Sequence, residues 1–418
     1  MKITYIHQYY NNPLMGGGTR SYEFAKRMVQ AGHTVNLVTT YRENTKKREW
    51  FQTNEDGITV HWLPVRYSND MSYLRRIIAF LKFSLGACRK AASFDADVIF
   101  ATSTPLTIIV PAYYAKLIRR IPIVFEVRDL WPELPIAMGA LQSPITRKLA
   151  KWMEIFAYRN SKAIVALSPG MKEGVIKVGI PSKSIATIPN SCDRDLFCYN
   201  KKAVSEFFAT RPWLKEKPFI LYAGTFGKIN GVDYFVDLAV ALDKLKAEIQ
   251  ILLIGEGSNF ELVQSKARAA GVLNKNLFVE KSVSKKEITA AFNAASVCSS
   301  VFIDEPAMRA NSSNKFFDTL AAGKPIFINY GGWMHDLISA RGVGFSAWQT
   351  SIDEAAIILN QKMSDRDWLM EAGKQAENLA VEYFDRDILA EQLIEVLEIA
   401  VNETVVDVER VAPGEYGD

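Results

Sequence analysis

Apolar and polar positions follow one repeating order along most of this chain. Short apolar runs, the pattern of buried strands, are followed by amphipathic stretches with the three-to-four-residue spacing of a helix. The order holds from residue 2 to about residue 190 and resumes at about residue 219. Strands that alternate with helices build parallel sheets with helices on both faces. We therefore predict an α/β protein with two doubly wound, Rossmann-like parallel-sheet domains.

The interruption of this order predicts the domain limits. A polar, proline-containing segment at 193–218 is typical of a linker, which places an N-terminal domain at 1–195 and a C-terminal domain at 218–384. A strongly periodic helix is expected at about 385–402. The segment 403–418 is acidic and polar, and we expect it to be a disordered tail.

Composition and charge exclude several classes of protein. The 418 residues are 49% hydrophobic and carry a net charge of +4, which fits a globular enzyme and predicts no nucleic-acid partner. No apolar segment follows a basic start, and no uninterrupted apolar run approaches the ~20 residues of a spanning helix. The four cysteines lack Cys-x-x-Cys spacing. We therefore expect a cytoplasmic protein without a disulfide framework or a zinc site.

A glycine-rich loop follows the first predicted strand. Residues 7–20 contain three adjacent glycines, Gly16, Gly17 and Gly18, and a helix is expected directly afterwards, from Ser21 to Ala31. Glycines let backbone amides approach a phosphate, and the helix adds its positive dipole end. The loop is too long for the tight dinucleotide turn, which disfavours a dehydrogenase. Gly17 and Gly18 are candidate phosphate-binding residues.

The segment 314–326 carries the second candidate site. Three and four residues separate neighbours on a helical face, so Asn314, Lys315 and Asp318 share one stripe of the predicted helix. Gly323 ends that helix. Lys315 and the helix N-terminus suit the phosphates of a sugar nucleotide, and Asp318 suits its ribose hydroxyls. An ordinary amphipathic helix with a glycine stop is the alternative interpretation.

Six motifs, in this order and spacing, resemble glycosyltransferase family 4, the retaining GT-B enzymes. Among these the chain is similar to the bacterial O-antigen, capsule and lipopolysaccharide transferases. The motifs are His7-Gln8-Tyr9 with Gly16-Gly17-Gly18-Thr19-Arg20, Glu126-Val127-Arg128-Asp129-Leu130-Trp131-Pro132-Glu133, Ile188-Pro189-Asn190-Ser191-Cys192-Asp193, Tyr222-Ala223-Gly224-Thr225-Phe226-Gly227-Lys228 with Gly231, Leu253-Ile254-Gly255-Glu256-Gly257, and the segment 314–326.

The resemblance implies a GT-B fold in which the two domains face a cleft and the C-terminal helix crosses back to the first domain. It implies a nucleotide sugar as donor, with no cofactor and no metal, because protein cations and helix ends stabilise the leaving diphosphate. Asp95-Ala96-Asp97 looks like a metal-binding motif. It precedes a strand, however, on the side away from ligands in a parallel sheet, which favours a plain turn.

The resemblance also places Asp129 near the transferred sugar and the acceptor hydroxyl, with Glu133 as the second catalytic candidate. A structural ion pair between Arg128 and Asp129 is the alternative. Asn190 and Asp193 match a family turn, and turn capping is the favoured interpretation for them.

Two departures from the family pattern affect the donor site. Thr225 and Asn230 stand where the family usually has cations, close to the matched Gly224. Lys228 lies between them, and it either reaches the same phosphates or is a solvated loop lysine. Ala310 replaces the first residue of the family's carboxylate pair. Glu256, between two glycines, is placed near the base or the ribose.

Two spans mix basic, aliphatic and aromatic residues, at 72–94 and 144–162. Basic amphipathic helices bind anionic bilayers, although helices that cover a sheet look similar. The lipid-linked acceptors of the family favour a membrane surface.

We therefore predict a retaining, metal-independent hexosyl- or N-acetylhexosaminyl-transferase, peripheral to the inner membrane face. It would move a sugar from a UDP- or GDP-sugar to a lipid-linked saccharide acceptor in surface polysaccharide synthesis. A nucleotide-sugar 2-epimerase of the same fold and a non-catalytic nucleotide-sugar-binding subunit are the alternatives.

Overall fold

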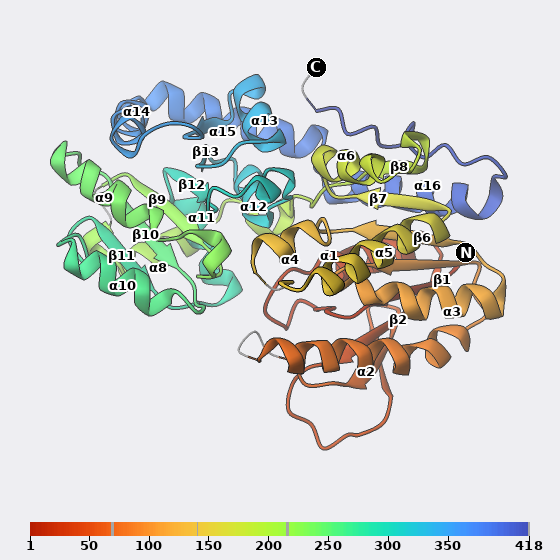
Figure 1. Ribbon diagram of the computed structural model, residues 1–418. Coiled ribbons are helices and arrows are strands. Elements are labelled where there is room, and N and C mark those ends of the chain that lie inside the picture. Colours follow the sequence, from red (N-terminus) through yellow and green to blue (C-terminus); the bar gives the residue numbers. More distant parts are fainter. Residues whose placement is uncertain (68–70, 140, 215–216, 417–418) are drawn as a thin grey trace. The chain divides into compact units, whose positions relative to one another are not determined.

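The computed structural model describes residues 1–67, 71–139, 141–214 and 217–416 (Figure 1). The chain forms two compact units. Unit 1 comprises Met1–Pro189, Ala310–Ser312 and Arg386–Glu415, and unit 2 comprises Asn190–Arg309, Ser313–Asp385 and the last residues from Tyr416. Each unit is an α/β structure on its own sheet, as predicted.

Unit 1 is built on an eight-stranded sheet in the order β3-β4-β2-β1-β5-β6-β7-β8. All neighbouring strands are parallel except β3, which pairs antiparallel with β4 at the edge. The strands are β1 (Lys2–His7), β2 (Thr34–Tyr41), β3 (Phe51–Glu55), β4 (Ile58–Pro64), β5 (Val98–Thr102), β6 (Ile123–Val127), β7 (Ala163–Ala166) and β8 (Ile185–Thr187).

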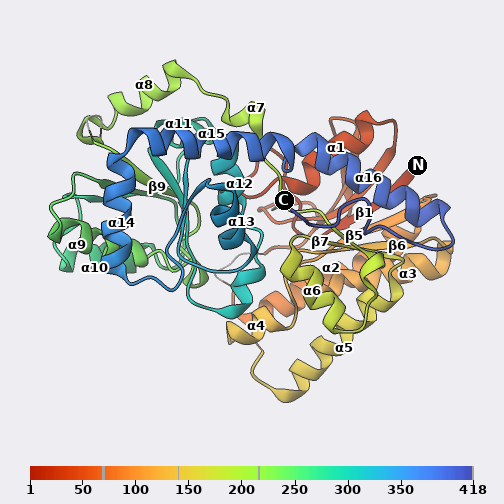
Figure 2. The ribbon, with the colours of Figure 1, turned by 90° about the horizontal axis from the view of Figure 1, so that it is seen from above.

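Helices cover both faces of this sheet because successive strand residues point to opposite sides. Phe100 of β5 lies in a core with α1 and α16, whereas its neighbours Ile99 and Ala101 lie in a core with α2, α3, α5 and α6. Figure 2 shows α16 running beside α1. The helices are α1 (Arg20–Gln30), α2 (Tyr73–Ala92), α3 (Ile109–Arg119), α4 (Glu133–Ala137), α5 (Pro144–Asn160), α6 (Pro169–Lys177) and α16 (Arg386–Asn402).

Unit 2 is built on six parallel strands in the order β11-β10-β9-β12-β13-β14. They are β9 (Phe219–Ala223), β10 (Gln250–Ile254), β11 (Leu277–Glu280), β12 (Val297–Ser300), β13 (Ile326–Ile328) and β14 (Gly344–Ser346). The helices are α7 (Arg194–Phe197), α8 (Lys201–Ala209), α9 (Tyr234–Lys244), α10 (Phe260–Ala269), α11 (Lys285–Ala294), α12 (Asn314–Ala321), α13 (Trp333–Arg341), α14 (Ile352–Ser364) and α15 (Arg366–Glu382).

The described part of the predicted linker is a folded portion of unit 2, which corrects the interpretation of 193–218. Helices α7 and α8 bury Phe197 and Phe207 against the sheet, and Leu214 is also buried. Arg211 lies among them with its guanidinium bonded to the carboxylate of Glu280. Polar residues dominate the segment, but its few apolar residues recur at helical spacing, and those residues provide the packing.

The predicted disordered tail is also wrong for its described part in unit 1. Val408 and Ala412 are buried, and the backbone amide of Val408 donates to the carbonyl of Lys183 at 2.8 Å. The amide of Thr187 donates to the carbonyl of Ala412 at 2.8 Å, so the segment provides a hydrogen-bond acceptor for the edge strand β8. Pairing with an exposed strand edge orders a polar segment that has little core of its own. Residues 417 and 418 lie outside the described residues.

Among the described residues, no helix has both the length and the apolar character that crossing a membrane requires.

We predict that Arg211→Ala destabilises unit 2 by about 2–4 kcal/mol, because it leaves two partly buried carboxylates without their partner. The side chain of Arg211 is 7% exposed, and its Nη2 lies 2.6 Å from Glu280 and 2.8 Å from Glu287. Urea unfolding measures the change. Lys217→Ala is the control, since Lys217 lies 4.0 Å from Glu248 at the surface and should cost less than about 1 kcal/mol. Equal losses in the two variants would contradict the assigned role.

Candidate active site

The predicted donor residues of unit 2 gather where the loop after β9 meets α12. The side chain of Lys315 lies directly over Gly224: a Cβ added to Gly224 would stand 2.3 Å from Lys315 Cε and 3.1 Å from its Nζ. Only glycine leaves room for the lysine here. The absence of a side chain at Gly224 therefore leaves the space through which the Lys315 side chain crosses the end of the sheet.

Burial changes the pKa of the Lys315 side chain. It lowers the pKa of the ammonium to about 8, although the charge of Asp318 on the same helix acts in the opposite direction. The described residues offer Lys315 no ion pair, and its Nζ lies 5.2 Å from the ring centroid of Tyr222. Tyr222 is held in place because its hydroxyl donates to the carbonyl of Thr225 at 2.8 Å. An ammonium without a protein carboxylate partner suits an anionic ligand.

Backbone hydrogen bonds join the loops after β9 and β10. The amide of Gly224 donates to the carbonyl of Ile254, and the amide of Phe226 donates to the carbonyl of Glu256, both at 2.9 Å. A Cβ at Gly255 would stand 1.8 Å from the carbonyl oxygen of Gly224, so the two loops touch. The Glu256 side chain is exposed beside them. These loops therefore form one continuous rim at the carboxyl ends of the strands.

The two positions that lack the usual family cations have local structural roles. Asn230 is buried, and its Oδ1 accepts from the amide of Gly227 at 3.3 Å, which closes the turn of residues 227–230. Thr225 accepts the hydroxyl of Tyr222 through its backbone. Lys228 is exposed on this turn, and no ion pair within the described ranges engages it. The cationic role of Lys228 remains a prediction.

Helix α12 displays the predicted stripe. Asn314 is exposed at its first residue, Lys315 follows, and Asp318 is half-buried one turn later. Tyr222 is the residue of this site that sequence reasoning missed; an aromatic residue just before a glycine-rich loop was its signal.

In unit 1, the glycine-rich loop joins β1 to α1. Gly17 has a φ of +109°, and a Cβ there would stand 2.8 Å from Nδ2 of Asn11. Asn11 crosses the loop and donates from Nδ2 to the carbonyl of Gly18 at 3.3 Å. Gly16, Gly17 and Gly18 are exposed. The side chain of Asn11 therefore holds the shape of the loop, while the three glycines stay exposed.

A buried histidine lies beside this loop at the end of β1. Arg128 Nη1 lies 3.4 Å from His7 Nε2, and Ser21 Oγ lies 2.8 Å from His7 Nδ1. Burial lowers the pKa of His7, and the nearby Arg128 lowers it further. Because a guanidinium only donates, Nε2 is the acceptor and the Nδ1 proton points to Ser21. His7 is thus a neutral residue with an assigned tautomer.

Asp129 follows Arg128 at the carboxyl end of β6. Burial raises the pKa of its carboxyl to about 6, and the charge of Arg128 opposes the shift. Within the described ranges no hydrogen bond or ion pair joins Arg128 to Asp129, although the charge of Arg128 acts on the Asp129 carboxyl, so the alternative of a structural Arg128–Asp129 pair stays a prediction. A partly buried carboxyl with a raised pKa, at the ligand edge of a sheet, fits proton transfer or acceptor orientation.

Glu133 lies one turn further along the chain and is turned toward α5. Its carboxylate is 3.3 Å from Lys151 Nζ, and the same ammonium lies 2.7 Å from the buried Glu154. Burial raises the pKa of Glu154 to about 7. Glu133 therefore belongs to a charged cluster with α5, and its catalytic role stays a prediction.

A buried ion pair that sequence reasoning did not assign fixes this side of unit 1. Arg20, the first residue of α1, donates from Nε and Nη2 to Glu126 Oε1 at 3.0 and 2.9 Å. It also donates to the carbonyls of Ile188, at 2.8 Å, and Pro189. The other oxygen of Glu126 accepts from Thr102 at 3.0 Å. The signal was a carboxylate inside the apolar strand β6.

Asp95 and Asp97 lie at the amino ends of the strands. Lys2 Nζ lies 2.6 Å from Asp95, and the amide of Lys2 donates to Asp97 at 2.7 Å. Asp193 Oδ1 accepts from the amide of Leu196 at 3.2 Å, which confirms its predicted capping role in α7. Across the part of the chain that the structure describes, no group of three or more His, Cys, Asp or Glu residues is arranged to hold a metal ion.

Two family models match most of the chain. The model described as Glycosyl transferase 4-like domain matches residues 15–191, and the model described as Glycosyl transferases group 1 matches residues 204–379. The chain belongs to glycosyltransferase family 4. This family 4 glycosyltransferase is 23% identical over 150 residues to the alpha-D-kanosaminyltransferase of Streptomyces kanamyceticus. That match covers 35% of this chain and 39% of the relative, well under half of its length.

Solved structures share the GT-B fold of this glycosyltransferase. Anabaena Alr3699/HepE in complex with UDP and glucose has a TM-score of 0.66 at 17% identity, covering 95% of this chain and 99% of that one. WaaG, a glycosyltransferase involved in lipopolysaccharide biosynthesis, has a TM-score of 0.68 at 14% identity, covering 94% and 99%. Sucrose-phosphate synthase of Thermosynechococcus elongatus has a TM-score of 0.72 at 13% identity, covering 95% and 98%. The predicted family and fold are confirmed.

We predict that Lys315→Gln lowers kcat/KM at least about tenfold, because a charged phosphate contact contributes roughly 1.5–3 kcal/mol. Since the pKa of Lys315 is about 8, nucleotide affinity of the parent enzyme should also fall as the pH rises above 8 and the ammonium loses its proton. Affinity of the variant should be flat over that range. Calorimetric titration with UDP between pH 7 and 9 measures both.

Gly224→Ala provides the matched variant for Lys315. Its new Cβ meets only the flexible end of Lys315, so stability should change little while donor affinity falls as in Lys315→Gln. A kcat/KM within about twofold of the parent in both variants would remove Lys315 from the donor site.

For Asp129→Asn, we predict that turnover collapses while nucleotide-sugar affinity stays nearly unchanged, because an amide keeps the shape but accepts no proton. The folded-state pKa of about 6 lies above the usual pKa of an aspartate side chain, about 3.9. The protonated form therefore favours the fold, and that contribution is lost as the pH rises through about 6. The variant should gain about 1–3 kcal/mol over the parent at pH 8 and much less at pH 4.

Melting temperature, transfer rate and nucleotide binding, measured on this one variant, test the assignment of Asp129. A normal transfer rate together with a lowered melting point would exclude the catalytic role.

Proposed function

We propose that this glycosyltransferase moves a hexose or an amino sugar from a UDP- or GDP-sugar to a lipid-linked saccharide. The transfer occurs with retention and without a metal, at the inner face of the cell membrane, in the synthesis of a bacterial surface polysaccharide. The enzyme class follows from the family; the acceptor class is the new part of the proposal.

The observation that carries the proposal is a second, exposed apolar side on three helices of one face of unit 1. Helices α2, α3 and α5 cover the sheet (Figure 1), yet each also exposes several apolar residues on its outward side, where a solvated helix is polar. The exposed apolar residues range from Val110, at 37%, to Ile145, at 77%. They are Leu74, Ile77, Ile78, Leu81 and Leu85 on α2, Val110, Tyr114, Leu117 and Ile118 on α3, and Ile145, Leu149 and Trp152 on α5.

An apolar groove runs between these helices. It has a volume of about 590 Å³ and is lined mainly by aliphatic and aromatic side chains, among them Leu85, Tyr113, Leu117, Trp152 and Phe156. Exposed apolar surfaces of this extent mark an interaction site rather than a solvated face.

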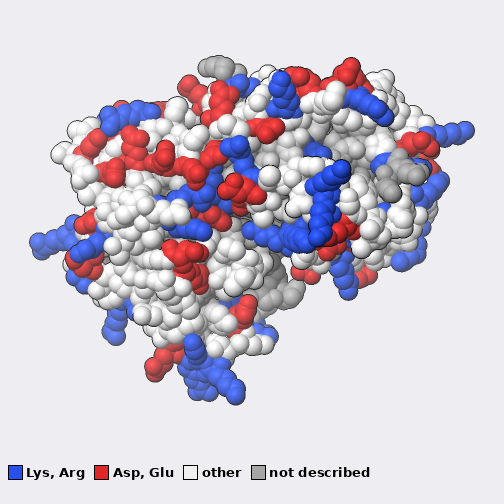
Figure 3. Space-filling view, turned by 180° about the vertical axis from the view of Figure 1, so that it is seen from behind, with Lys and Arg blue, Asp and Glu red and all other residues white. Residues whose placement is uncertain are grey.

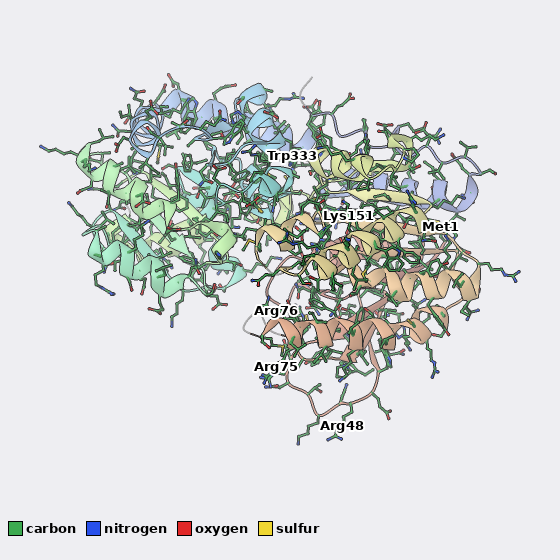
Figure 4. The ribbon with its side chains drawn as sticks, in the orientation of Figure 1. Met1, Arg48, Arg75, Arg76, Lys151 and Trp333 are labelled. Carbon is green, nitrogen blue, oxygen red and sulfur yellow. The ribbon has the colours of Figure 1, made fainter. Side chains whose placement is uncertain are left out.

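Basic residues flank the apolar surface. Figure 4 labels Arg75 and Arg76 at the start of α2. Arg89 reaches the rim of the groove from α2. Apolar side chains with basic neighbours suit the headgroup region of an anionic bilayer, where the apolar part is buried and the cations meet lipid phosphates. We infer that unit 1 rests on the membrane that holds the acceptor.

The donor assignment draws on Lys315 and on the similar structures. Lys315 offers a buried ammonium without an ion-pair partner in the described chain, and Gly224 leaves it room. Alr3699/HepE was solved with UDP and glucose, and WaaG is described as acting in lipopolysaccharide biosynthesis, which supports a UDP-sugar donor and a surface-polysaccharide acceptor. In this proposal the donor phosphates are bound by Lys315, Lys228 and the start of α12, where Asn314 lies. Asp318 binds the ribose, and Asp129 orients the acceptor hydroxyl.

We predict that the double variant Leu81→Gln and Leu85→Gln loses binding to vesicles of phosphatidylglycerol and phosphatidylcholine, and loses transfer to a lipid-linked acceptor. The thermal shift with UDP should be unchanged, because both leucines lie on α2 of unit 1. Vesicle flotation and a radiolabelled transfer assay measure the effects. Leu262→Gln with Ile357→Gln is the control, since these exposed residues lie on α10 and α14 of unit 2. Vesicle binding lost equally in both variants would contradict the proposed surface.

Metal independence predicts that transfer survives EDTA at full rate, because protein cations neutralise the leaving diphosphate. The transfer assay with and without EDTA, followed by Mg²⁺ or Mn²⁺, measures this. Activity that disappears with the chelator and returns with the metal would overturn this part of the proposal.

A further inference from the structure

A basic hollow lies at the carboxyl ends of β2 and β4 in unit 1. It has a volume of about 440 Å³ and is lined by the loop of residues 41–48, the end of β4 and one side chain of α2. Its cations are Lys47, Arg48, Arg66 and Lys82. Ligands of parallel sheets bind at this edge of the strands. The hollow belongs to unit 1, whereas Gly224, Lys315 and Asp318 belong to unit 2.

No carboxylate of the described residues forms an ion pair with the cations of this hollow. Glu43 is the one carboxylate among its lining residues, and its Oε2 already accepts from the hydroxyl of Tyr41 at 3.2 Å. In the ranges that the structure describes, none of the four cations forms an ion pair. Figure 4 labels Arg48 on this loop, and Figure 3 shows Lys and Arg side chains gathered at the lower end of the molecule. A cluster of cations without carboxylate partners attracts an anion.

The loop that carries the cations is anchored on both sides. Lys47 Nζ lies 3.8 Å from the ring centroid of Phe51, the first residue of β3. Arg42 donates to the carbonyl of Tyr10 at 3.4 Å and to the side chain of Asn11, the residue that crosses the glycine-rich loop. The loop that lines the hollow is therefore bonded directly to the glycine-rich loop.

Helix α2 connects the hollow to the apolar surface. Lys82 lines the hollow, whereas Leu85, three residues further on, lines the apolar groove together with Arg89. Residues three apart are neighbours on a helix, so the cationic and apolar sites adjoin on α2. A molecule that spans both needs an anionic group joined to a long apolar chain.

We propose that this hollow binds the phosphate or diphosphate that joins lipid to saccharide in the acceptor. Arg48 and Arg66 offer planar guanidinium groups for two-point contact with phosphate oxygens, and Lys47 and Lys82 add point charges. The apolar chain leaves along α2 toward the membrane. The proposal rests on the lipid-linked acceptor of the proposed function and adds the site that recognises its anionic link.

Binding of farnesyl diphosphate, a soluble lipid diphosphate without a sugar, tests the proposal. Calorimetry is run on the full chain with excess UDP, which occupies the nucleotide site. The double variant Arg48→Gln and Lys82→Gln should weaken binding by about tenfold or more, since two charged contacts are lost. The control, Lys46→Gln with Arg268→Gln, removes the same net charge from residues that do not line the hollow, and its affinity should stay within about twofold.

Three results would overturn the proposal. Equal affinities in the two double variants would show that only general charge matters. Inorganic pyrophosphate that binds the hollow as tightly as farnesyl diphosphate would make it a site for free phosphates. Selective loss of binding to phosphatidylglycerol vesicles, with farnesyl diphosphate binding intact, would assign the hollow to the headgroups of bulk lipid.

Binding of farnesyl diphosphate is measured without any sugar transfer. The proposed phosphate site and the proposed acceptor reaction can therefore be tested separately. If farnesyl diphosphate binds as expected but no lipid-linked saccharide is glycosylated, the proposed acceptor reaction fails and the phosphate site stands. If transfer occurs and the hollow variant transfers and binds normally, the phosphate site fails alone.

Discussion

Both units depend on the common direction of their strands. Parallel pairing sends every carboxyl end to the same edge of a sheet, so residues that are far apart in sequence meet there without further arrangement. In unit 1 this brings His7, at the end of β1, to Arg128, just after β6. In unit 2 it brings Gly224 to the carbonyl of Ile254 and Gly255 to that of Glu280. The candidate chemistry of each unit lies on such an edge.

Some charged side chains on these edges have a protein partner of opposite charge and others have none. We assign structural roles to the paired side chains and candidate functional roles to the unpaired ones. Arg20 and Glu126 are buried together, and the remaining donors of Arg20 are met by two carbonyls, which is the condition under which a buried ion pair is tolerated. Lys315 and Asp129 have no such partner among the described residues, and burial moves the pKa of each toward neutrality. An anionic ligand beside Lys315 would relieve this cost for the ammonium.

The outward side of unit 1 follows a different rule from the rest of the surface. Helices α1 and α16 bury their apolar residues in the core. Helices α2, α3 and α5 also contribute to a core, yet they expose a second apolar face. That second face has no structural purpose in an isolated sheet, which is why we connect it with a lipid, and the adjoining basic hollow with the lipid's phosphate.

The sequence by itself determined the fold class, the strand positions and the candidate donor residues, because these follow from local periodicity and from motifs a few residues long. Asn314, Lys315 and Asp318 share a helical stripe for that reason. Only the tertiary structure decided which polar segments fold and which charges pair. Arg211 meets Glu280 across 69 residues, Arg20 meets Glu126 across 106, and the tail pairs with β8. These contacts depend on burial and on pairing between residues far apart in the chain. Neither can be predicted from the spacing of neighbouring residues.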